Sequence, residues 1–179
     1  MDKGELYRMA LAYLGTYEYV PGSAEVRALD DVCGHVLRQA GGYARWRWAL
    51  RREVVQLDGD GAARLPGDFV EMERCSLSGW EVLGNEVVAR DGSRCVPVEL
   101  VFVSRAWADS CELPEHAPVF CEGCALLLAA KAAVRVTGNF NLAAALEERA
   151  REAFYRARLA EARQQSSNDQ LAGEEVDCG

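Results

Sequence analysis

Residues 118–165 read PVFCEGCALLLAAKAAVRVTGNFNLAAALEERAREAFYRARLAEARQQ and predict two successive helices. Apolar residues recur three and four positions apart in the first half, and Pro118 suits the first position of a helix. Gly138 is expected to end this helix, and Asn141 to cap a second one that reaches about Gln165. The alanines of the first helix would let another helix approach closely. The segment therefore predicts part of a helical bundle.

Three further helices are predicted upstream. The first spans about residues 3–14, with Asp2 and Glu5 as a capping box and apolar residues along one face. The second begins after Ser23, a good N-cap, and is stopped by a pair of glycines. The third is expected over residues 43–55. Its four arginines should form a solvated or salt-bridged face: Arg45, Arg47, Arg51 and Arg52.

The sequence pattern changes after the third predicted helix, where strand signals begin. Residues 70–74 alternate in the manner of a strand with one solvated face. Gly84 and Asn85 separate two short apolar runs, which is a hairpin signal. Residues 95–103 predict a further strand, and Pro97 within it favours an edge position or a bulge. We therefore expect a small antiparallel sheet.

The expected fold class is α+β: a helical bundle of about five helices with a small antiparallel β-sheet inserted between helices three and four, and an extended C-terminal tail. The expected divisions are N-terminal helices over 1–55, the sheet over 56–104, C-terminal helices over 105–165 and a flexible acidic tail over 166–179. The tail lacks apolar periodicity and carries four acidic residues and no basic one. Such a composition predicts disorder when the tail is free.

Composition narrows the protein class. The chain has 179 residues, of which 50% are hydrophobic and 27% charged, an ordinary balance for a globular protein. Its length suits one domain, or one domain that carries a small subdomain. A net charge of −8 argues against a mainly nucleic-acid-binding surface, which would have to neutralise phosphates. No apolar run reaches the ~20 residues of a membrane span, and no signal peptide is expected. These features predict a cytosolic protein.

Few residues are candidates for chemistry. His35 and His116 belong to no recognisable catalytic triad, and the sequence contains no phosphate-binding loop. Seven cysteines without a secretion signal predict reduced thiols. Cys121 and Cys124 have zinc-ligand spacing, with Cys111 and His116 upstream, but the leucines and alanines that follow favour a helix core. We therefore expect no enzymatic activity, no cofactor and no bound metal.

Several local features follow one another in a familiar order. They are YARWRWALRREVV at 43–55, LPGDF at 65–69, the hairpin that begins at Trp80, LPEHAPVF at 113–120, the helix end at Thr137-Gly138, and AREAFYRARLAEARQ at 150–164. In this order, and over about residues 4–165, the chain resembles the head–tail connector family of tailed bacteriophages, of the adaptor or tail tubular protein A type.

The resemblance implies a structural protein of the virion neck, made in the host bacterial cytoplasm. Such proteins form twelve-fold rings of identical subunits beneath the portal, so the implied partners are other copies of the chain, the portal protein, and the nozzle or other tail proteins. Double-stranded DNA would pass through the channel without specific binding, and no membrane is involved. The helices would form the ring body and the sheet would project toward the tail.

By position, the resemblance also implies contact residues. Those toward the portal are Arg158, Arg163, Gln164, Gln165, Asp169, Leu171 and Val176. Those on the tail-facing sheet are Trp80, Leu83 and Asn85. Two alternatives remain open: another phage structural protein, such as a stopper or tail-completion factor, and a small intracellular metal-binding module or enzyme. The latter would use Cys111, His116, Cys121 and Cys124.

Overall fold

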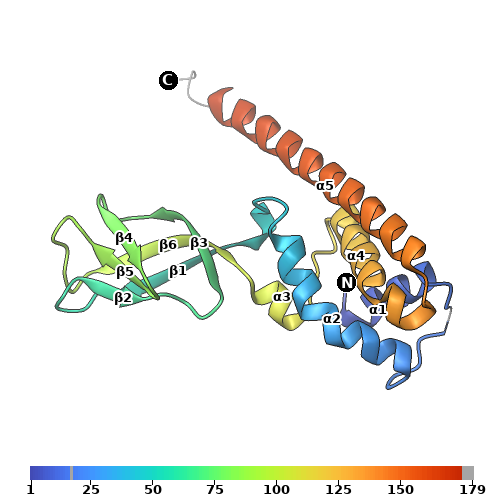
Figure 1. Ribbon diagram of the computed structural model, residues 1–179. Helices are drawn as coiled ribbons and strands as arrows, with labels where there is room; N and C mark the ends of the chain where they lie inside the picture. The colour runs from blue at the N-terminus through green and yellow to red at the C-terminus, as the bar shows by residue number, and fades with distance from the viewer. Residues whose placement is uncertain (17, 175–179) are drawn as a thin grey trace. The chain divides into compact units, whose positions relative to one another are not determined.

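The computed structural model describes the backbone of residues 1–16 and 18–174, and the side chains of these residues as far as Arg163 (Figure 1). The chain divides into two compact units. The first, called the helical unit, consists of Met1–Arg45 and the residues from Trp107 onward. The second, called the strand unit, is Trp46–Ala106.

Among the described residues, the α-helices are α1 (Lys3–Tyr13), α2 (Ala24–Gly41), α3 (Ala106–Ser110), α4 (Pro118–Thr137) and α5 (Phe140–Glu174). They belong to the helical unit, except that α3 begins at Ala106, the last residue of the strand unit. α4 packs against α1, α2 and α5, and α5 lies along α4 (Figure 1). Short α3 had no counterpart among the predicted helices.

The predicted starts of the first two helices are confirmed. Asp2 and Glu5 form a reciprocal capping box, in which each side chain accepts a hydrogen bond from the other residue's backbone N–H. The Ser23 hydroxyl accepts a hydrogen bond of 3.2 Å from the N–H of Val26. α2 ends at Gly41, as the glycine pair predicts. These local bonds satisfy backbone donors that a helix start leaves unpaired.

α4 is the central helix of its unit. A helix that is apolar all round is enclosed by its neighbours, and α4 is buried along most of its length at Phe120, Cys121, Gly123, Cys124, Ala125, Leu126, Leu127, Leu128, Ala129, Ala130, Ala132 and Ala133. Its small residues permit the close approach of α5 that the sequence predicts. At Gly123, an added Cβ would lie only 2.8 Å from the ring of Phe154 on α5.

The turn between α4 and α5 matches the prediction at one residue and differs at another. Gly138 adopts the left-handed conformation, with φ of 69°, and ends α4. The residue that caps α5 is Asn139, whose side-chain oxygen accepts a 3.0 Å hydrogen bond from the N–H of Leu142. The prediction of Asn141 as the cap is therefore wrong by two positions.

The C-terminal end of α5 also differs from the prediction. The helix backbone continues to Glu174, beyond the expected end near Gln165. An extended tail is therefore wrong for residues 166–174, whereas residues 175–179 lie outside the described part of the chain. Once a helix is nucleated, each added residue gains a hydrogen bond, so a helix can continue without an apolar stripe.

The strand unit contains two antiparallel sheets of three strands, in the orders β1-β6-β3 and β2-β5-β4. The strands are β1 (Leu50–Gln56), β2 (Ala62–Arg64), β3 (Phe69–Cys75), β4 (Trp80–Leu83), β5 (Glu86–Ala89) and β6 (Pro97–Ser104). The predicted strand at 70–74 and the predicted hairpin around Gly84 and Asn85 are confirmed as β3 and the pair β4–β5.

Both sheets contribute to one small apolar core. β6 alternates along its length, so that Val98, Leu100 and Phe102 are fully buried while the residues between them are partly exposed. Val87 of β5 and Leu57, which follows β1, belong to the same buried cluster. The strand unit therefore has a hydrophobic core made by its own residues.

Residues 43–55 do not form the predicted third helix. Residues 47–49 make one 3₁₀ turn, and Leu50–Gln56 form β1, which pairs with β6 along its whole length. Val55 packs against the core of the strand unit whereas Val54 is 63% exposed, which is the alternation of a strand. The helix prediction is wrong because pairing with a strand distant in sequence overrides local spacing.

The expectation that Pro97 marks an edge strand or a bulge is also wrong. β6 is the central strand of its sheet and pairs with both β1 and β3. Pro97 is the first residue of β6, a position at which the missing N–H is tolerated. The register shifts of this sheet lie instead in the pairing of β3 with β6.

The fold class is therefore α+β with a different order from the predicted one. Two helices are followed by two small three-stranded sheets and then by three helices, so the sheets lie between helices two and three. A five-helix bundle with one sheet between helices three and four is not formed. Among the described residues, no helix combines the length and apolar character that crossing a membrane requires.

Candidate functional site

The proposed zinc ligands do not converge. Within residues 1–16 and 18–174, no three or more histidine, cysteine, aspartate or glutamate side chains are arranged to hold a metal ion. His116 is exposed, whereas Cys121 and Cys124 are buried in α4. The Cys121 thiol donates to the backbone carbonyl of Pro114 at 3.3 Å. The interpretation of this cysteine pair as helix core is confirmed.

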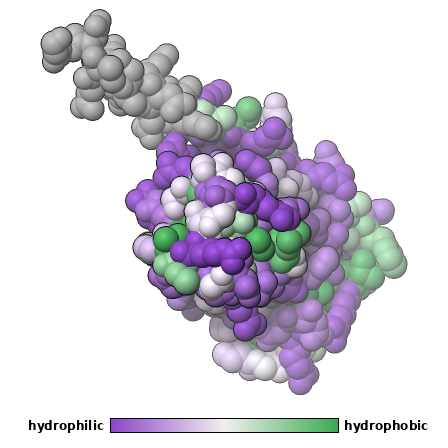
Figure 2. Space-filling model, turned by 90° about the vertical axis from the view of Figure 1, so that its left-hand side faces the viewer, coloured by the Kyte–Doolittle hydropathy of each residue, from purple (hydrophilic) through white to green (hydrophobic). Residues whose placement is uncertain are grey.

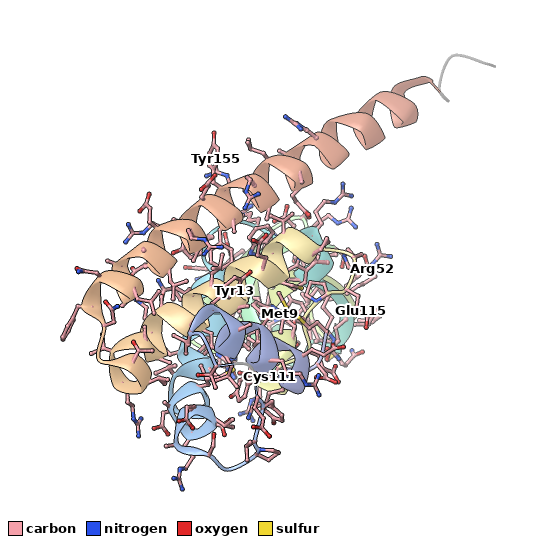
Figure 3. The ribbon with its side chains drawn as sticks, turned by 90° about the vertical axis from the view of Figure 1, so that its right-hand side faces the viewer. Met9, Tyr13, Arg52, Cys111, Glu115 and Tyr155 are labelled. Atoms are coloured by element: carbon pink, nitrogen blue, oxygen red, sulfur yellow. The ribbon has the colours of Figure 1, made fainter. Side chains whose placement is uncertain are left out.

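Cys111 instead lies against Cys33, which is 78 positions away in the sequence. The two Sγ atoms are 3.8 Å apart. Cys33 belongs to α2 and is 3% exposed, whereas Cys111 is partly exposed and follows α3 in a left-handed conformation, with φ of 56°. Figure 3 shows Cys111 beside α1 and α2. The tertiary structure thus places two thiols together.

A polar cluster lies next to this thiol pair and joins α1 to α2. The buried Tyr7 hydroxyl donates a 2.6 Å hydrogen bond to the Asp30 carboxylate, and the Lys3 ammonium lies 2.6 Å from the same carboxylate. Lys3 also lies 5.3 Å from the centre of the Tyr7 ring. Tyr7 and Cys33 also influence each other's pKa, so the polar cluster acts on the thiol pair.

The ionisation of the cluster follows from these contacts. The hydrogen bond from Lys3 is the main cause of the lowered pKa of Asp30, with that from Tyr7 second. Burial raises the pKa of Tyr7, and burial also raises the pKa of the Cys33 thiol to about 11. At neutral pH the cluster therefore contains one carboxylate and one ammonium beside a neutral phenol and a neutral buried thiol. Cys33 is not an activated nucleophile.

The candidate tail-facing residues lie on a single hairpin of the strand unit. Trp80 is 36% and Leu83 47% exposed on β4, an edge strand, and Asn85 is exposed in the turn to β5. The surface in Figure 2 shows hydrophobic groups set among hydrophilic ones. The hairpin therefore offers apolar side chains to solvent.

The candidate portal-facing residues that the structure describes lie on the C-terminal half of α5. Arg158 and Arg163 are exposed, the helix backbone includes residues 164–174, and Val176 lies outside the described residues. The last buried side chain of α5, as far as side chains are described, is Ala157. The other candidates in the helical backbone are Gln164, Gln165, Asp169 and Leu171.

The same part of α5 exposes apolar side chains. Tyr155 is 61% and Leu159 40% exposed. Figure 3 shows Tyr155 pointing away from α4. Residues four apart lie on one side of a helix, so Tyr155 and Leu159 form a short apolar stripe on the surface of α5.

The expectation of a salt-bridged face on the arginine-rich segment is confirmed for two arginines, although they belong to a strand. Arg51 lies 3.1 Å from the Asp68 carboxylate, and Arg52 lies 3.6 Å from that of Glu99. Arg74 of the neighbouring strand also approaches Glu99, at 3.8 Å. These charges compensate one another within the strand unit and do not form an unpaired basic patch there.

Two features of the molecule were missed by sequence reasoning. The contact of Cys33 with Cys111 had no local signal, because it depends on how α2 packs against the segment after α3. The continuation of α5 beyond residue 165 was not predicted, because the sequence there is polar and lacks the apolar periodicity of a packed helix. Comparison with known proteins adds no assignment: no protein-family model and no curated protein matches this chain.

Proposed function

We propose that the chain is a head–tail connector of a tailed bacteriophage, a structural protein that forms a ring of identical subunits, twelve in the resembling family, between portal and tail. In this proposal the C-terminal half of α5 contacts the portal and the β4–β5 hairpin contacts the tail. DNA passes through the ring without specific binding. The proposal rests on the sequence resemblance together with the surfaces described above.

The observation that carries the proposal is the continuation of the α5 backbone past the last buried side chain that the structure describes in this helix. Seventeen helical residues follow Ala157, the last buried side chain among those described, and at 1.5 Å per residue they extend about 25 Å. Among the first six of these residues, whose side chains are described, Arg158, Leu159 and Ala160 are exposed, so an apolar side chain of α5 faces solvent just after the last buried one. We therefore infer that a partner packs against this end of α5, where Leu159 and Arg158 are already exposed.

The exposed hairpin supports a second contact at a different place. Trp80 and Leu83 lie on an edge strand, which has backbone groups open to pairing and apolar side chains open to burial. A ring subunit that joins two larger bodies needs separate surfaces for each. The α5 end and the hairpin are such surfaces, and they belong to different units of the chain.

The charge of the chain suits a DNA passage. Duplex DNA carries about one negative charge per 1.7 Å of its axis, so a strongly basic lining would hold it in place. A chain of net charge −8 would let DNA slide. Closed rings also require two complementary faces on each copy, and the mixed-charge surface of α5, with Arg151 paired to Glu147 and Glu148, offers groups for such contacts.

Electron microscopy tests this proposal directly. The full chain would be mixed with portal rings from the genome that encodes it, and the particles would be imaged and weighed by mass photometry. We expect ring density beneath the portal with one copy of the chain for each portal subunit. A chain that remains monomeric and joins no portal would contradict the proposal.

Matched surface variants then locate the portal contact. Leu159→Glu places a charge on α5, whereas Val70→Glu places the same charge on a strand-unit residue of comparable exposure, 54% against 40%. We expect Leu159→Glu, and deletion of residues 166–179, to weaken portal docking at least tenfold while Val70→Glu leaves it unchanged. Equal docking by all variants would refute the role of α5.

A further inference from the structure

We propose that Cys33 and Cys111 form a redox-active dithiol, which small-molecule disulfides of the glutathione type oxidise to a disulfide joining α2 to the segment after α3. The inference goes beyond the proposed function and does not depend on it. It rests on the position of the two thiols in the helical unit. The reduced pair is the form in the structure.

The geometry brings the two sulfur atoms close to bonding distance. They lie 3.8 Å apart, and a disulfide bond is about 2.05 Å long, so the sulfurs must approach by roughly 1.8 Å. Rotation of both side chains and a small backbone shift can supply this movement. Cys111 lies between the short helix α3 and α4, outside regular structure. This segment is easier to adjust than α2, in which Cys33 is fixed.

The difference in exposure assigns an order to the two thiols. Cys111 is partly exposed, so its thiolate can attack one sulfur of the small disulfide. The S–S bond of that reagent breaks, one small thiol leaves, and Cys111 carries a mixed disulfide. Cys33 then loses its proton to solvent and attacks Sγ of Cys111, which releases the second small thiol. Two electrons pass from the protein thiols to the small disulfide, which becomes two thiols.

The surroundings of Cys33 make the second step depend on pH. Four titratable groups act on the Cys33 thiol. They are Lys3 and Tyr7 of α1, Cys111 in the segment after α3, and Cys124 of α4. Burial is the largest effect and raises the pKa of Cys33 to about 11. Since only the thiolate attacks, the rate of ring closure should increase close to tenfold for each pH unit between about pH 7 and 9.

The other described cysteines differ from this pair and serve as controls. Cys95 is exposed and Cys75 is partly buried, and both belong to the strand unit. Cys121 donates to a backbone carbonyl, and Cys124 is fully buried in α4. A reagent that merely reacts with accessible thiols would modify Cys95 first. A reagent that closes the proposed bond would link Cys33 to Cys111.

If the proposed function holds, the dithiol would meet two environments. The host cytosol keeps thiols reduced, whereas the surroundings of a released virion are oxidising. The pair would then be reduced during assembly and oxidised in the free particle. This consequence, unlike the chemistry of the pair, rests on the proposed function.

Peptide mapping of the full chain tests the inference. Reduced protein would be incubated with oxidised glutathione under native conditions, digested without reductant and analysed by mass spectrometry. We expect a peptide pair linked through Cys33 and Cys111, at a mass about 2 Da below the sum of the free peptides. A lasting glutathione adduct on Cys111 without linkage, linkage of other cysteines, or linkage only in urea would each overturn the proposal.

Single variants test the order of the steps. In the Cys33→Ser protein the reaction should stop at one glutathione adduct on Cys111. In the Cys111→Ser protein Cys33 should stay unmodified. The Cys95→Ser protein should form the Cys33–Cys111 disulfide at the rate of the unaltered chain. The rate of closure is also measured between pH 7 and 9. A closure rate that does not rise with pH would contradict attack by the buried thiol.

Discussion

The contact between Gly123 and Phe154 gives the sharpest stability prediction. The two residues lie where α4 and α5 pack together, and Gly123 has no side chain to separate the helices. A Cβ added at Gly123 would lie 2.8, 3.0 and 3.1 Å from three carbons of the Phe154 ring. The ring cannot easily withdraw, because Tyr43 stacks on it at 4.4 Å and Phe120 lies 5.7 Å away. Gly123→Ala should therefore destabilise the helical unit.

Two effects of opposite sign determine how much Gly123→Ala changes the free energy of unfolding. Replacement of glycine by alanine inside a helix stabilises it by up to about 1 kcal/mol. Overpacking of a tight core costs about 1–3 kcal/mol. Gly34→Ala in α2 should show only the stabilising effect, because its Cβ would meet only the end of the Arg38 side chain, at 3.5 Å. The two variants should therefore differ by about 1–3 kcal/mol in free energy of unfolding.

Urea unfolding followed by far-ultraviolet circular dichroism measures this difference. We expect Gly34→Ala to raise the unfolding midpoint and Gly123→Ala to lower it. In a Phe154→Leu background the difference should shrink, because the rigid ring is gone. A Gly123→Ala protein as stable as Gly34→Ala, or a penalty that persists undiminished in the Phe154→Leu background, would refute the reasoning.

Two further predictions concern the other unit and the polar cluster. Gly61 has φ of 80°, and an added Cβ would lie 2.9 Å from the Ser93 carbonyl oxygen. Gly61→Ala should therefore lower the free energy of unfolding of the strand unit by at least about 1–2 kcal/mol, as measured by urea unfolding. Asp30 has a lowered pKa through its hydrogen bonds from Lys3 and Tyr7, so its ionised form stabilises the fold above about pH 4, and this contribution is lost as pH falls through the lower folded value. Asp30→Asn should therefore lower stability at pH 7 by less than about 1 kcal/mol, since the Lys3–Asp30 pair is largely exposed. The difference in stability between the two proteins should shrink progressively as pH falls below about 4.

The chemistry of the candidate site was only partly visible in the sequence. The expectation that Cys121 and Cys124 are helix core follows from the apolar residues beside them and is confirmed. The pairing of Cys111 with Cys33 could not be predicted, because no pattern relates residues 78 positions apart. The exposure of Leu159 was also hidden, since apolar periodicity does not reveal where a neighbouring helix ends.

The sequence by itself determined the elements whose signals are local. Capping by Asp2 and Ser23, the end of α4 at Gly138 and the hairpin at Gly84 depend on residues within a few positions of one another. Their hydrogen bonds and backbone preferences act wherever the segment lies in the fold. These features were therefore predicted correctly before any packing was known.

Only the tertiary structure decided the elements whose stability comes from distant partners. Residues 50–56 have a spacing compatible with a helix, but pairing with β6 makes them a strand. Pro97 suggested an edge, but its place at the first position lets β6 lie at the centre of its sheet. The physical reason is the same in both cases: strand hydrogen bonds and the burial they bring join segments far apart in the chain, so local sequence carries little of their free energy.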